Sequence, residues 1–263
     1  MGRLTPTVKI IIVANVILWV GTILFLKGNI INLNDMLAFH FPGSPLYKPW
    51  QFVTHMFMHA NLDYGSGQVV IYHILFNMLG LWMFGSPLEQ MWGRNKFIFF
   101  YFSAGVGAVL IQLGFNYYEF QSGMEVFETA GYSVTSVKEL LVNYNFQSPS
   151  KQLMDLLSSD LIFAGESMQS NFLGTMLGAS GALYGVLVAF AFSFPNAELM
   201  LIFLPIPIKA KYFVPLMILG DLFFGFSNYS TGIAHFAHIG GAITGFIMMW
   251  YWKKNEFNKN RWN

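Results

Sequence analysis

The chain of 263 residues contains no cysteine, and only 10% of its residues are charged. Without cysteine it can form no disulfide, no thiolate metal site and no cysteine nucleophile. Soluble proteins carry roughly a quarter of charged residues, whereas here 55% of the residues are hydrophobic and 18% are aromatic. The net charge of +1 gives no sign of nucleic-acid binding. This composition predicts an all-α, polytopic membrane protein whose first partner is the lipid bilayer.

Six stretches approach the length of about 20 mostly apolar residues that a membrane-spanning helix needs. They are residues 8–26, 69–84, 97–115, 172–194, 212–226 and 235–252. Six spans place both termini on the same side of the membrane, and all but four of the fourteen Lys and Arg residues fall on that side. Because basic residues concentrate on the cytoplasmic side, we predict six transmembrane helices with both termini cytoplasmic.

We expect residues 1–263 to form a single membrane domain with two long outer segments. Residues 28–68 form the first outer loop, and side chains such as Tyr47, Trp50 and Met56 make it too apolar for a free loop. We therefore expect this loop to be partly embedded in the membrane. Residues 118–171 form an insertion with seven acidic residues and two stretches of helical spacing, which predicts a small cap outside the membrane.

Ser180 lies in the fourth apolar stretch between Gly178 and Gly181. A serine in a glycine-rich apolar helix most often serves only packing, because small residues let membrane helices approach closely. At about 1.5 Å per residue, Ser180 lies roughly 12 Å below the outer end of this stretch, and Tyr184 lies one turn deeper on the same face. Whether Ser180 has a chemical role depends on the polar groups that lie near it.

Three further polar residues stand at a similar depth in other apolar stretches. His73 and Asn77 share one face of the second stretch at i and i+4, and His238 lies near the outer end of the sixth. Polar groups at this depth cost free energy unless they face a bundle interior or a watery cavity. We therefore expect these side chains to meet Ser180 in one site.

The chemistry of these groups suggests their roles. A serine needs a neighbouring base to become a nucleophile, and the imidazole of His238 suits that task. The His73 ring, the Asn77 amide and the Ser180 backbone N–H could stabilise an oxyanion. Because the fourth and sixth stretches hold no carboxylate at this depth, we expect a Ser–His dyad rather than a triad, with the Tyr184 ring stacked on His238.

Two other polar residues near the site are given no catalytic role. We expect Asp221, near the outer end of the fifth stretch, to be hydrogen-bonded or at the interface, and His235 to be a bystander. His55 and His59 have the i, i+4 spacing of two metal ligands, but no carboxylate or cysteine accompanies them. We therefore expect neither a metal nor a cofactor.

Several segments resemble the signatures of rhomboid intramembrane serine proteases. They are residues 178–181 (Gly-Ala-Ser-Gly) with Tyr184, residues 73–77 (His-Ile-Leu-Phe-Asn), residues 237–241 (Ala-His-Ile-Gly-Gly) followed by Gly245, residues 50–59, and Glu89 with Gly93. The first of these patterns is weak alone, whereas the three span motifs together are specific. The resemblance covers roughly residues 50 to 252.

The resemblance implies a six-helix bundle with a water-filled cavity that opens to the outside. Ser180 would attack a peptide bond of a transmembrane substrate, His238 would act as base and then acid, and residues 227–234 would form a movable lid. Gly241 and Gly245 would pack the sixth span against the fourth. A bacterial inner membrane is the expected location, with transmembrane proteins as substrates.

Two departures and two rival functions remain. Residues 59–73 and 118–171 form longer segments than in the simplest members of the family. The family's first loop often reads Trp-Arg, and here Gln51 follows Trp50, which puts a charge-based role of that loop in doubt. The main rival is a catalytically inactive relative that binds transmembrane helices, although such relatives typically lack the dyad residues. The other is a transporter, which the absence of an inverted repeat disfavours.

Overall fold

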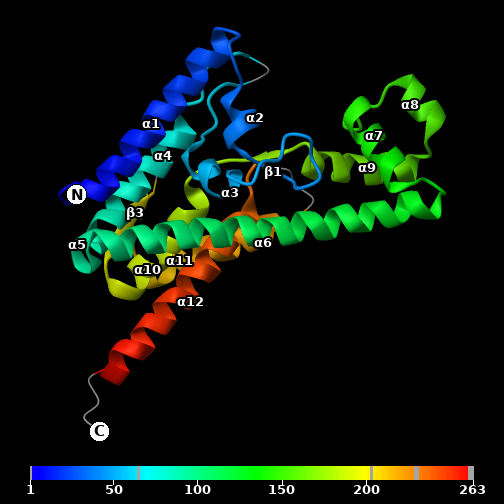
Figure 1. The fold of residues 1–263 in the computed structure, drawn as a ribbon. Helices are drawn as coiled ribbons and strands as arrows, with labels where there is room; N and C mark the ends of the chain where they lie inside the picture. Colours follow the sequence, from blue (N-terminus) through cyan, green and yellow to red (C-terminus); the bar gives the residue numbers. More distant parts are fainter. Residues whose placement is uncertain (1, 64–65, 202–203, 228–230, 260–263) are drawn as a thin grey trace.

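The computed structural model describes residues 2–63, 66–201, 204–227 and 231–259, and this part of the chain is mostly helical (Figure 1). The helices are α1 (Pro6–Lys27), α2 (Leu33–Leu37), α3 (Gln51–Thr54), α4 (Tyr72–Gly80), α5 (Ser86–Trp92), α6 (Arg94–Thr129), α7 (Val134–Asn143), α8 (Lys151–Leu156), α9 (Ser159–Phe172), α10 (Ser180–Ser193), α11 (Ala210–Gly225) and α12 (His235–Lys259). A 3₁₀ turn, η1 (His55–Phe57), follows α3, and a π-helical turn, η2 (Leu81–Gly85), joins α4 to α5.

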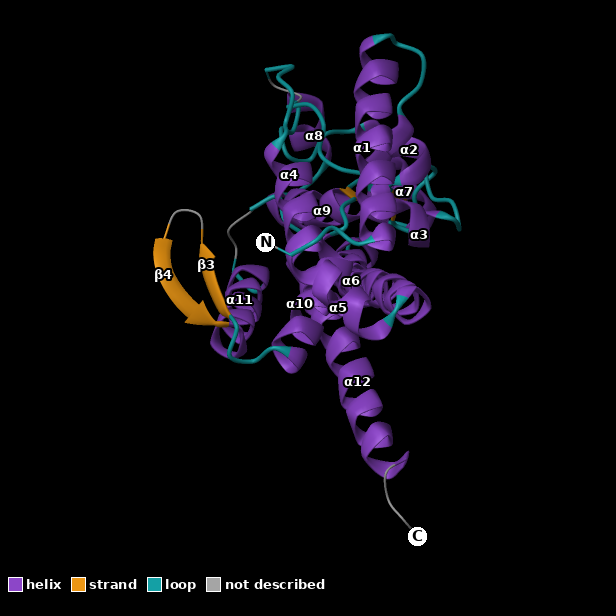
Figure 2. Ribbon diagram, turned by 90° about the vertical axis from the view of Figure 1, so that its left-hand side faces the viewer, coloured by secondary structure: helices purple, strands orange, loops and turns teal. Residues whose placement is uncertain are grey.

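Four short strands form two small antiparallel sheets. β1 (Phe39–His40) pairs with β2 (Thr175–Met176), and β3 (Glu198–Leu201) pairs with β4 (Leu204–Lys209). The β3–β4 hairpin lies beside α11 (Figure 2). The β1–β2 pair connects the first outer loop to the segment that leads into α10.

Each of the six apolar stretches contains a helix. By length and composition, α1 and α6 are the two helices among the described residues that could cross a membrane, and α10 is a shorter apolar helix. Large apolar side chains point outward from the bundle, among them Leu216, Leu219 and Phe223 of α11, each at least 60% exposed. Such a surface suits lipid rather than water. The number of spans and the cytoplasmic position of both termini stay predictions.

Helices α6, α10 and α12 pack against one another at the centre of the molecule (Figure 1). Their contacts depend on small residues, because a Cβ atom added at Gly181 would lie 2.5 Å from the Cβ of Ala108. A Cβ at Gly241 would lie 1.8 Å from the Gly181 carbonyl oxygen, and one at Gly245 would lie 2.7 Å from the Gly185 Cα. The backbones of α10 and α12 therefore touch, as small residues allow in membrane helices.

The outer insertion is a helical unit at the far end of α6 (Figure 1). The third apolar stretch ends near residue 115, but α6 continues as one helix to Thr129 and so enters the insertion. Helices α7 and α9 pack against its extension. These helices and α8 enclose a separate apolar cluster that includes Phe127, Leu141, Phe146 and Leu153. The expected cap needs an apolar core of its own, and this cluster provides one. The division of the chain into one membrane domain with two outer segments stays a prediction.

The fourth apolar stretch is not one helix, so the predicted depth of Ser180 is wrong. α9 ends at Phe172, a turn and the short strand β2 (Thr175–Met176) follow, and α10 begins at Ser180 itself. Gly178 has φ +125°, a conformation that residues with a Cβ rarely adopt, and its N–H donates a hydrogen bond to the His55 carbonyl oxygen at 3.0 Å. The backbone is therefore tied to the first outer loop and cannot continue the helix.

Gln51 organises the first outer loop from a fully buried position. Its Oε1 accepts hydrogen bonds from the backbone N–H groups of His40 and Lys48, and its Nε2 donates to the Leu46 carbonyl oxygen at 2.9 Å. The Trp50 indole donates to the Met36 carbonyl oxygen at 2.9 Å. A neutral amide therefore holds this loop in shape through backbone contacts.

Candidate active site

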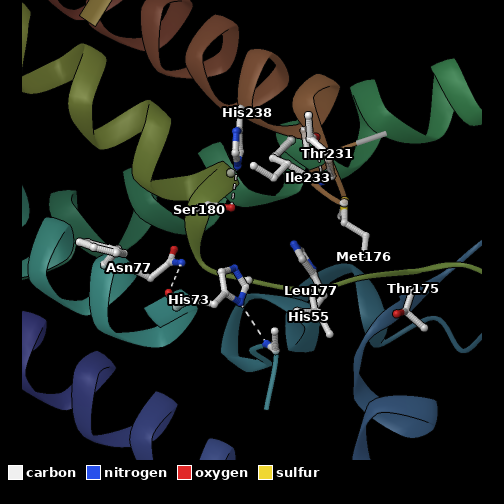
Figure 3. A pocket seen from close by; sticks show the side chains of 18 of the residues that line it. His55, His73, Asn77, Thr175, Met176, Leu177, Ser180, Thr231, Ile233 and His238 are labelled. Atoms are coloured by element: carbon white, nitrogen blue, oxygen red, sulfur yellow. Dashed lines mark hydrogen bonds between the residues drawn. The ribbon is translucent and has the colours of Figure 1, made fainter. Parts of the chain in front are cut away.

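Ser180 and His238 come from different helices and are hydrogen-bonded to each other. The Ser180 Oγ lies 2.9 Å from the His238 Nε2, although 58 residues separate them in the chain (Figure 3). Ser180 is the first residue of α10, and His238 lies in the first turn of α12. The close contact of these helices at Gly181 and Gly241 sets this distance.

The two residues open onto a cavity of about 460 Å³. Its lining includes His73 and Asn77 from α4, the segment before Ser180, and part of the segment before α12 (Figure 3). The structure therefore gathers the four polar residues that the sequence predicts to meet. Of the expected lid, residues 228–230 lie outside the described residues, whereas Thr231, Gly232, Ile233 and Ala234 line the cavity.

The hydrogen bonds of His73 fix its tautomer. Its Nδ1 accepts a hydrogen bond from the Ala60 backbone N–H at 3.0 Å, so in the neutral ring the proton is on Nε2. This Nε2 edge approaches Gly178, where an added Cβ would lie 3.1 Å from Nε2 and 3.5 Å from the Ser180 Oγ. The ring thus directs a donor toward the space beside Ser180.

Asn77 presents its amide on the same side of the cavity as His73 (Figure 3). Its Nδ2 donates to the His73 carbonyl oxygen at 2.8 Å. Because a carbonyl can only accept, this contact fixes the orientation of the amide, and the second N–H of Nδ2 remains for another acceptor. The side chain is buried, with 5% of its surface exposed.

The position of Ser180 at the start of α10 supplies a further donor. The first four N–H groups of a helix have no partner within it, and the helix dipole makes this end favourable for negative charge. The Ser180 N–H belongs to this first turn. The break in the fourth apolar stretch therefore exposes a backbone donor that a continuous helix would have used.

Asp221 of α11 is hydrogen-bonded, as expected, but its partner is His238, so the expected dyad has a carboxylate beside its base. Its Oδ1 lies 3.0 Å from the His238 Nδ1 and 2.6 Å from the His235 Nδ1. Only 6% of the Asp221 surface is exposed. The fourth and sixth stretches hold no carboxylate at this depth, but Asp221 lies in the fifth stretch, on α11. A lone carboxylate in an apolar stretch was the signal available.

Tyr184 lies one turn along α10 from Ser180 and stacks on His238. The ring centroids are 4.3 Å apart and the ring planes differ by 11°. The imidazole is therefore held on one face by an aromatic ring and at its Nδ1 edge by Asp221. His235, expected to be a bystander, belongs to the same hydrogen-bonded group and is also a neighbour of His238, with ring centroids 6.4 Å apart.

His55 and His59 do not form a pair of ligands on one helical face, because the helical turn ends at Phe57. The His55 Nδ1 lies 2.9 Å from the Gln51 carbonyl oxygen, and the His59 Nε2 lies 2.8 Å from the Asn15 Oδ1. Burial lowers the pKa of His55 to about 4 and that of His59 to about 3. Both rings are therefore neutral near pH 7 and serve the packing of the first outer loop. Among the described residues, the cluster with metal-ligand atoms is Asp221, His235 and His238.

Comparison with known proteins gives the following matches. A family model described as Rhomboid domain matches residues 47–255. An uncharacterized mitochondrial rhomboid protein of Schizosaccharomyces pombe is 28% identical over 222 residues, which are 79% of this chain and 52% of the relative. Rhomboid protein 1, mitochondrial, of Saccharomyces cerevisiae is 24% identical over 224 residues, 80% of this chain and 49% of the relative. Rhomboid protease GluP of Bacillus subtilis is 27% identical over 99 residues, 36% of this chain and 18% of the relative.

These matches correct one expectation and limit another. The expected bacterial inner membrane is wrong, because both yeast relatives are mitochondrial proteins of eukaryotes. The chain spans about half the length of these two relatives. What the complete relatives act on therefore reaches this chain only as a proposal.

Proposed function

The chain belongs to the rhomboid family, and from this premise we propose that it is a serine protease that cleaves transmembrane segments of membrane proteins. The observation that carries the proposal is the contact of 2.9 Å between the Ser180 Oγ and the His238 Nε2. A nucleophile and a base in this relation, beside a cavity with convergent donors, are the components of acyl transfer. The names of the yeast relatives support a mitochondrial membrane as the location.

In the first step, Ser180 attacks the carbonyl carbon of the scissile peptide bond. The His238 Nε2 takes the hydroxyl proton as the new C–O bond forms. The carbonyl oxygen gains negative charge in the tetrahedral intermediate. When the C–N bond breaks, the His238 Nε2–H gives its proton to the leaving amine, and the substrate remains as an ester of Ser180.

The oxyanion of this intermediate needs donors that are already in place. His73 contributes its Nε2–H, because Ala60 occupies the Nδ1. Asn77 contributes the amide N–H that does not bind the His73 carbonyl. The Ser180 backbone N–H is the third donor, at the positive end of α10. All three belong to the wall of one cavity or to its nucleophile.

In the second step, a water molecule hydrolyses the ester. His238 takes a proton from this water, which attacks the acyl carbon, and then returns a proton to the Ser180 Oγ as the C–O bond breaks. Water must therefore reach Ser180. The cavity that exposes Ser180 provides space for both water and an unfolded segment of substrate.

Labelling with a fluorophosphonate and cleavage of a single-span reporter in proteoliposomes test the proposal. We expect the wild type to be labelled and to cleave the reporter, and we expect Ser180→Ala to do neither. Ser193→Ala, a serine at the other end of α10, is the matched control and should behave as the wild type. We also expect His238→Ala to be inactive but folded. Labelling and cleavage that persist in Ser180→Ala would exclude Ser180 as the nucleophile, and a wild type that is neither labelled nor active would favour helix binding without catalysis.

A further inference from the structure

We propose that Asp221 is a positioning residue for His238, and that His235 and Thr231 hold Asp221 in place. These residues form one hydrogen-bonded chain of side chains, from Thr231 in the cavity wall to the nucleophile Ser180. This inference rests on the proposed protease function. The chain of contacts is Thr231 Oγ1 to His235 Nε2 at 2.7 Å, His235 Nδ1 to Asp221 Oδ1 at 2.6 Å, Asp221 Oδ1 to His238 Nδ1 at 3.0 Å, and His238 Nε2 to Ser180 Oγ at 2.9 Å.

A single assignment of protons satisfies every contact when both rings are neutral. An ionised carboxylate can only accept, so His235 and His238 each carry a proton on Nδ1. The His238 Nε2 is then free to accept from the Ser180 hydroxyl, as a general base requires. The His235 Nε2 likewise accepts from the Thr231 hydroxyl. Asp221 therefore selects the tautomer of His238 that can take the proton of Ser180.

The burial of Asp221 makes its two histidine donors necessary. Asp221 is 6% exposed, and most of the other side chains of its helix are apolar. A charge in such surroundings requires hydrogen bonds or an opposite charge. The Oδ1 receives both imidazole N–H groups, and the carboxylate also interacts with the Tyr184 hydroxyl. The site thus holds Asp221 with three side chains, two of which come from α12.

The same three side chains could hold a metal ion, but their distances favour hydrogen bonding. Their ligand atoms lie within 4.8 Å of one another. Tetrahedral zinc ligands at about 2.0–2.1 Å from the metal are roughly 3.3 Å apart. The contacts of Asp221 with His235 and His238, 2.6 and 3.0 Å, are shorter and match charge-assisted hydrogen bonds. A zinc ion would also occupy the Nδ1 that must carry the proton.

Thr231 belongs both to the cavity wall and to the hydrogen-bonded chain of side chains. Thr231 and its neighbours Gly232 and Ile233 line the cavity that holds Ser180 (Figure 3). Thr231 bonds to His235, one turn before His238 on the same face of α12. A change at the wall beside the substrate can therefore reach His238 through His235 and Asp221.

The pH dependence of cleavage tests Asp221. The titratable groups around His238 are Asp221 from α11, Tyr184 from α10, His235 from α12 and His73 from α4. Asp221→Asn removes the one negative charge among them and offers an amide in place of a pure acceptor. We expect kcat to fall about 100-fold, less than the roughly 10⁴-fold of a soluble triad, because Tyr184 still holds the ring. We also expect the acid limb of the kcat/KM profile to move to lower pH.

Matched variants separate a positioning role from a structural one. Asp221→Glu keeps the charge and should recover part of the lost kcat together with the position of the acid limb. Asp155→Asn, an exposed aspartate of α8 outside the site, should leave both kcat and the profile unchanged. Thermal unfolding in detergent shows whether each variant is folded.

A double-mutant cycle tests His235, and its single variants at His235 remain informative if Asp221→Asn does not fold. His235→Leu removes the donor to Asp221, and we expect kcat to fall about fivefold, whereas His235→Asn keeps a donor near Nδ1 and should retain most of the activity. If His235 acts through Asp221, His235→Leu causes no further loss in the Asp221→Asn background. Unchanged kcat in His235→Leu, or losses that multiply in the double variant, would overturn its assigned role.

The same cleavage assay tests the role of Asp221 separately from the protease function. Cleavage by Ser180→Ala would refute the proposed protease function, in which Ser180 is the nucleophile. If Ser180→Ala is inactive while Asp221→Asn matches the wild type in kcat and in pH profile, the protease function stands and the role of Asp221 is refuted. A chelator should leave wild-type cleavage unchanged, and stimulation by added zinc would contradict the hydrogen-bonded chain.

Discussion

The imidazole of His238 lies flat against the phenol ring of Tyr184, with centroids 4.3 Å apart and planes 11° from parallel. Tyr184 comes from the helix of Ser180, and His238 comes from α12. The stack therefore connects the orientation of the base to the helix that carries the nucleophile. A ring held on its face and at Nδ1 has little freedom to turn its Nε2 away from Ser180.

We expect Tyr184→Ala to lower kcat by about two- to tenfold, because a stacked aromatic pair contributes roughly 0.5–1.5 kcal/mol beyond its burial and its loss frees the imidazole. Tyr184→Phe keeps the ring and should retain most of the activity. Steady-state cleavage of a transmembrane reporter by both variants is the measurement. Equal losses in the two variants would show that the hydroxyl, and not the stack, is what matters.

Asn77→Ala should lower kcat by about tenfold or more and change KM much less, because an oxyanion donor acts mainly in the transition state. Kinetics over a range of reporter concentrations in proteoliposomes separate the two parameters. Asn77→Asp, which keeps the shape of the side chain and removes its donors, should likewise lower kcat and change KM much less. A variant with normal kcat and raised KM would assign Asn77 to substrate binding instead.

Gly241→Ala should destabilise the fold by about 1–3 kcal/mol, the usual cost of overpacking a filled site. The new Cβ would lie 1.8 Å from the Gly181 carbonyl oxygen, so α12 must move away from α10. Since Gly181 follows Ser180, cleavage should fall as well. Thermal unfolding in detergent measures the first effect. Gly114→Ala, where a Cβ meets nothing within 4 Å, is the matched control and should unfold at or above the wild-type temperature.

Glu89 connects the first helix to the segment after the second apolar stretch. Its carboxylate accepts hydrogen bonds from the Thr5 hydroxyl and from the backbone N–H groups of Thr7 and Val8 at 2.9 and 3.0 Å. Burial raises the pKa of the Glu89 carboxyl, but these hydrogen bonds outweigh burial and hold the pKa below its ordinary value. The charged form is therefore the one that the fold stabilises.

We expect Glu89→Gln to lower the free energy of unfolding by about 1–3 kcal/mol near pH 7, because an amide cannot accept from all three donors. A carboxyl whose pKa is lower in the folded state stabilises the fold above its unfolded pKa, near 4.3, and loses this effect as the pH falls through its folded pKa. The gap between wild type and variant should therefore narrow in acid. Unfolding temperatures in detergent from pH 7 to pH 3 measure it. A gap that stays constant would place the effect in packing alone.

The sequence was informative about chemistry that lies within short motifs. Ser180 with its flanking glycines, His73 with Asn77, and His238 with Gly241 each occupy one apolar stretch, where polar residues are costly and therefore conspicuous. Hydropathy located a helix in each of the six apolar stretches for the same reason, and the number of spans stays a prediction. The small residues beside Ser180 and His238 likewise indicated which helices could approach closely.

Short motifs could not predict two features of the site, which are the start of α10 at Ser180 and the contact of Asp221 with His238. A glycine permits a helix as well as a break, and the break before Ser180 depends on contacts of residues 175–178 with Phe39, His40 and His55 in the first outer loop. Those contacts join segments more than 100 residues apart, so local propensity carries no record of them. The position of Ser180 at a helix start, with its free N–H, follows from the break.

What the sequence by itself determined is the membrane character of the chain and its family, and it predicted Ser180 as the nucleophile and His238 as the base, because composition and short motifs express these directly. Only the tertiary structure decided which carboxylate contacts His238. Asp221 lies 17 residues before His238 on another helix, and the packing of α11 against α12 brings its Oδ1 to the imidazole. That packing involves whole helices, and no spacing along the chain encodes it.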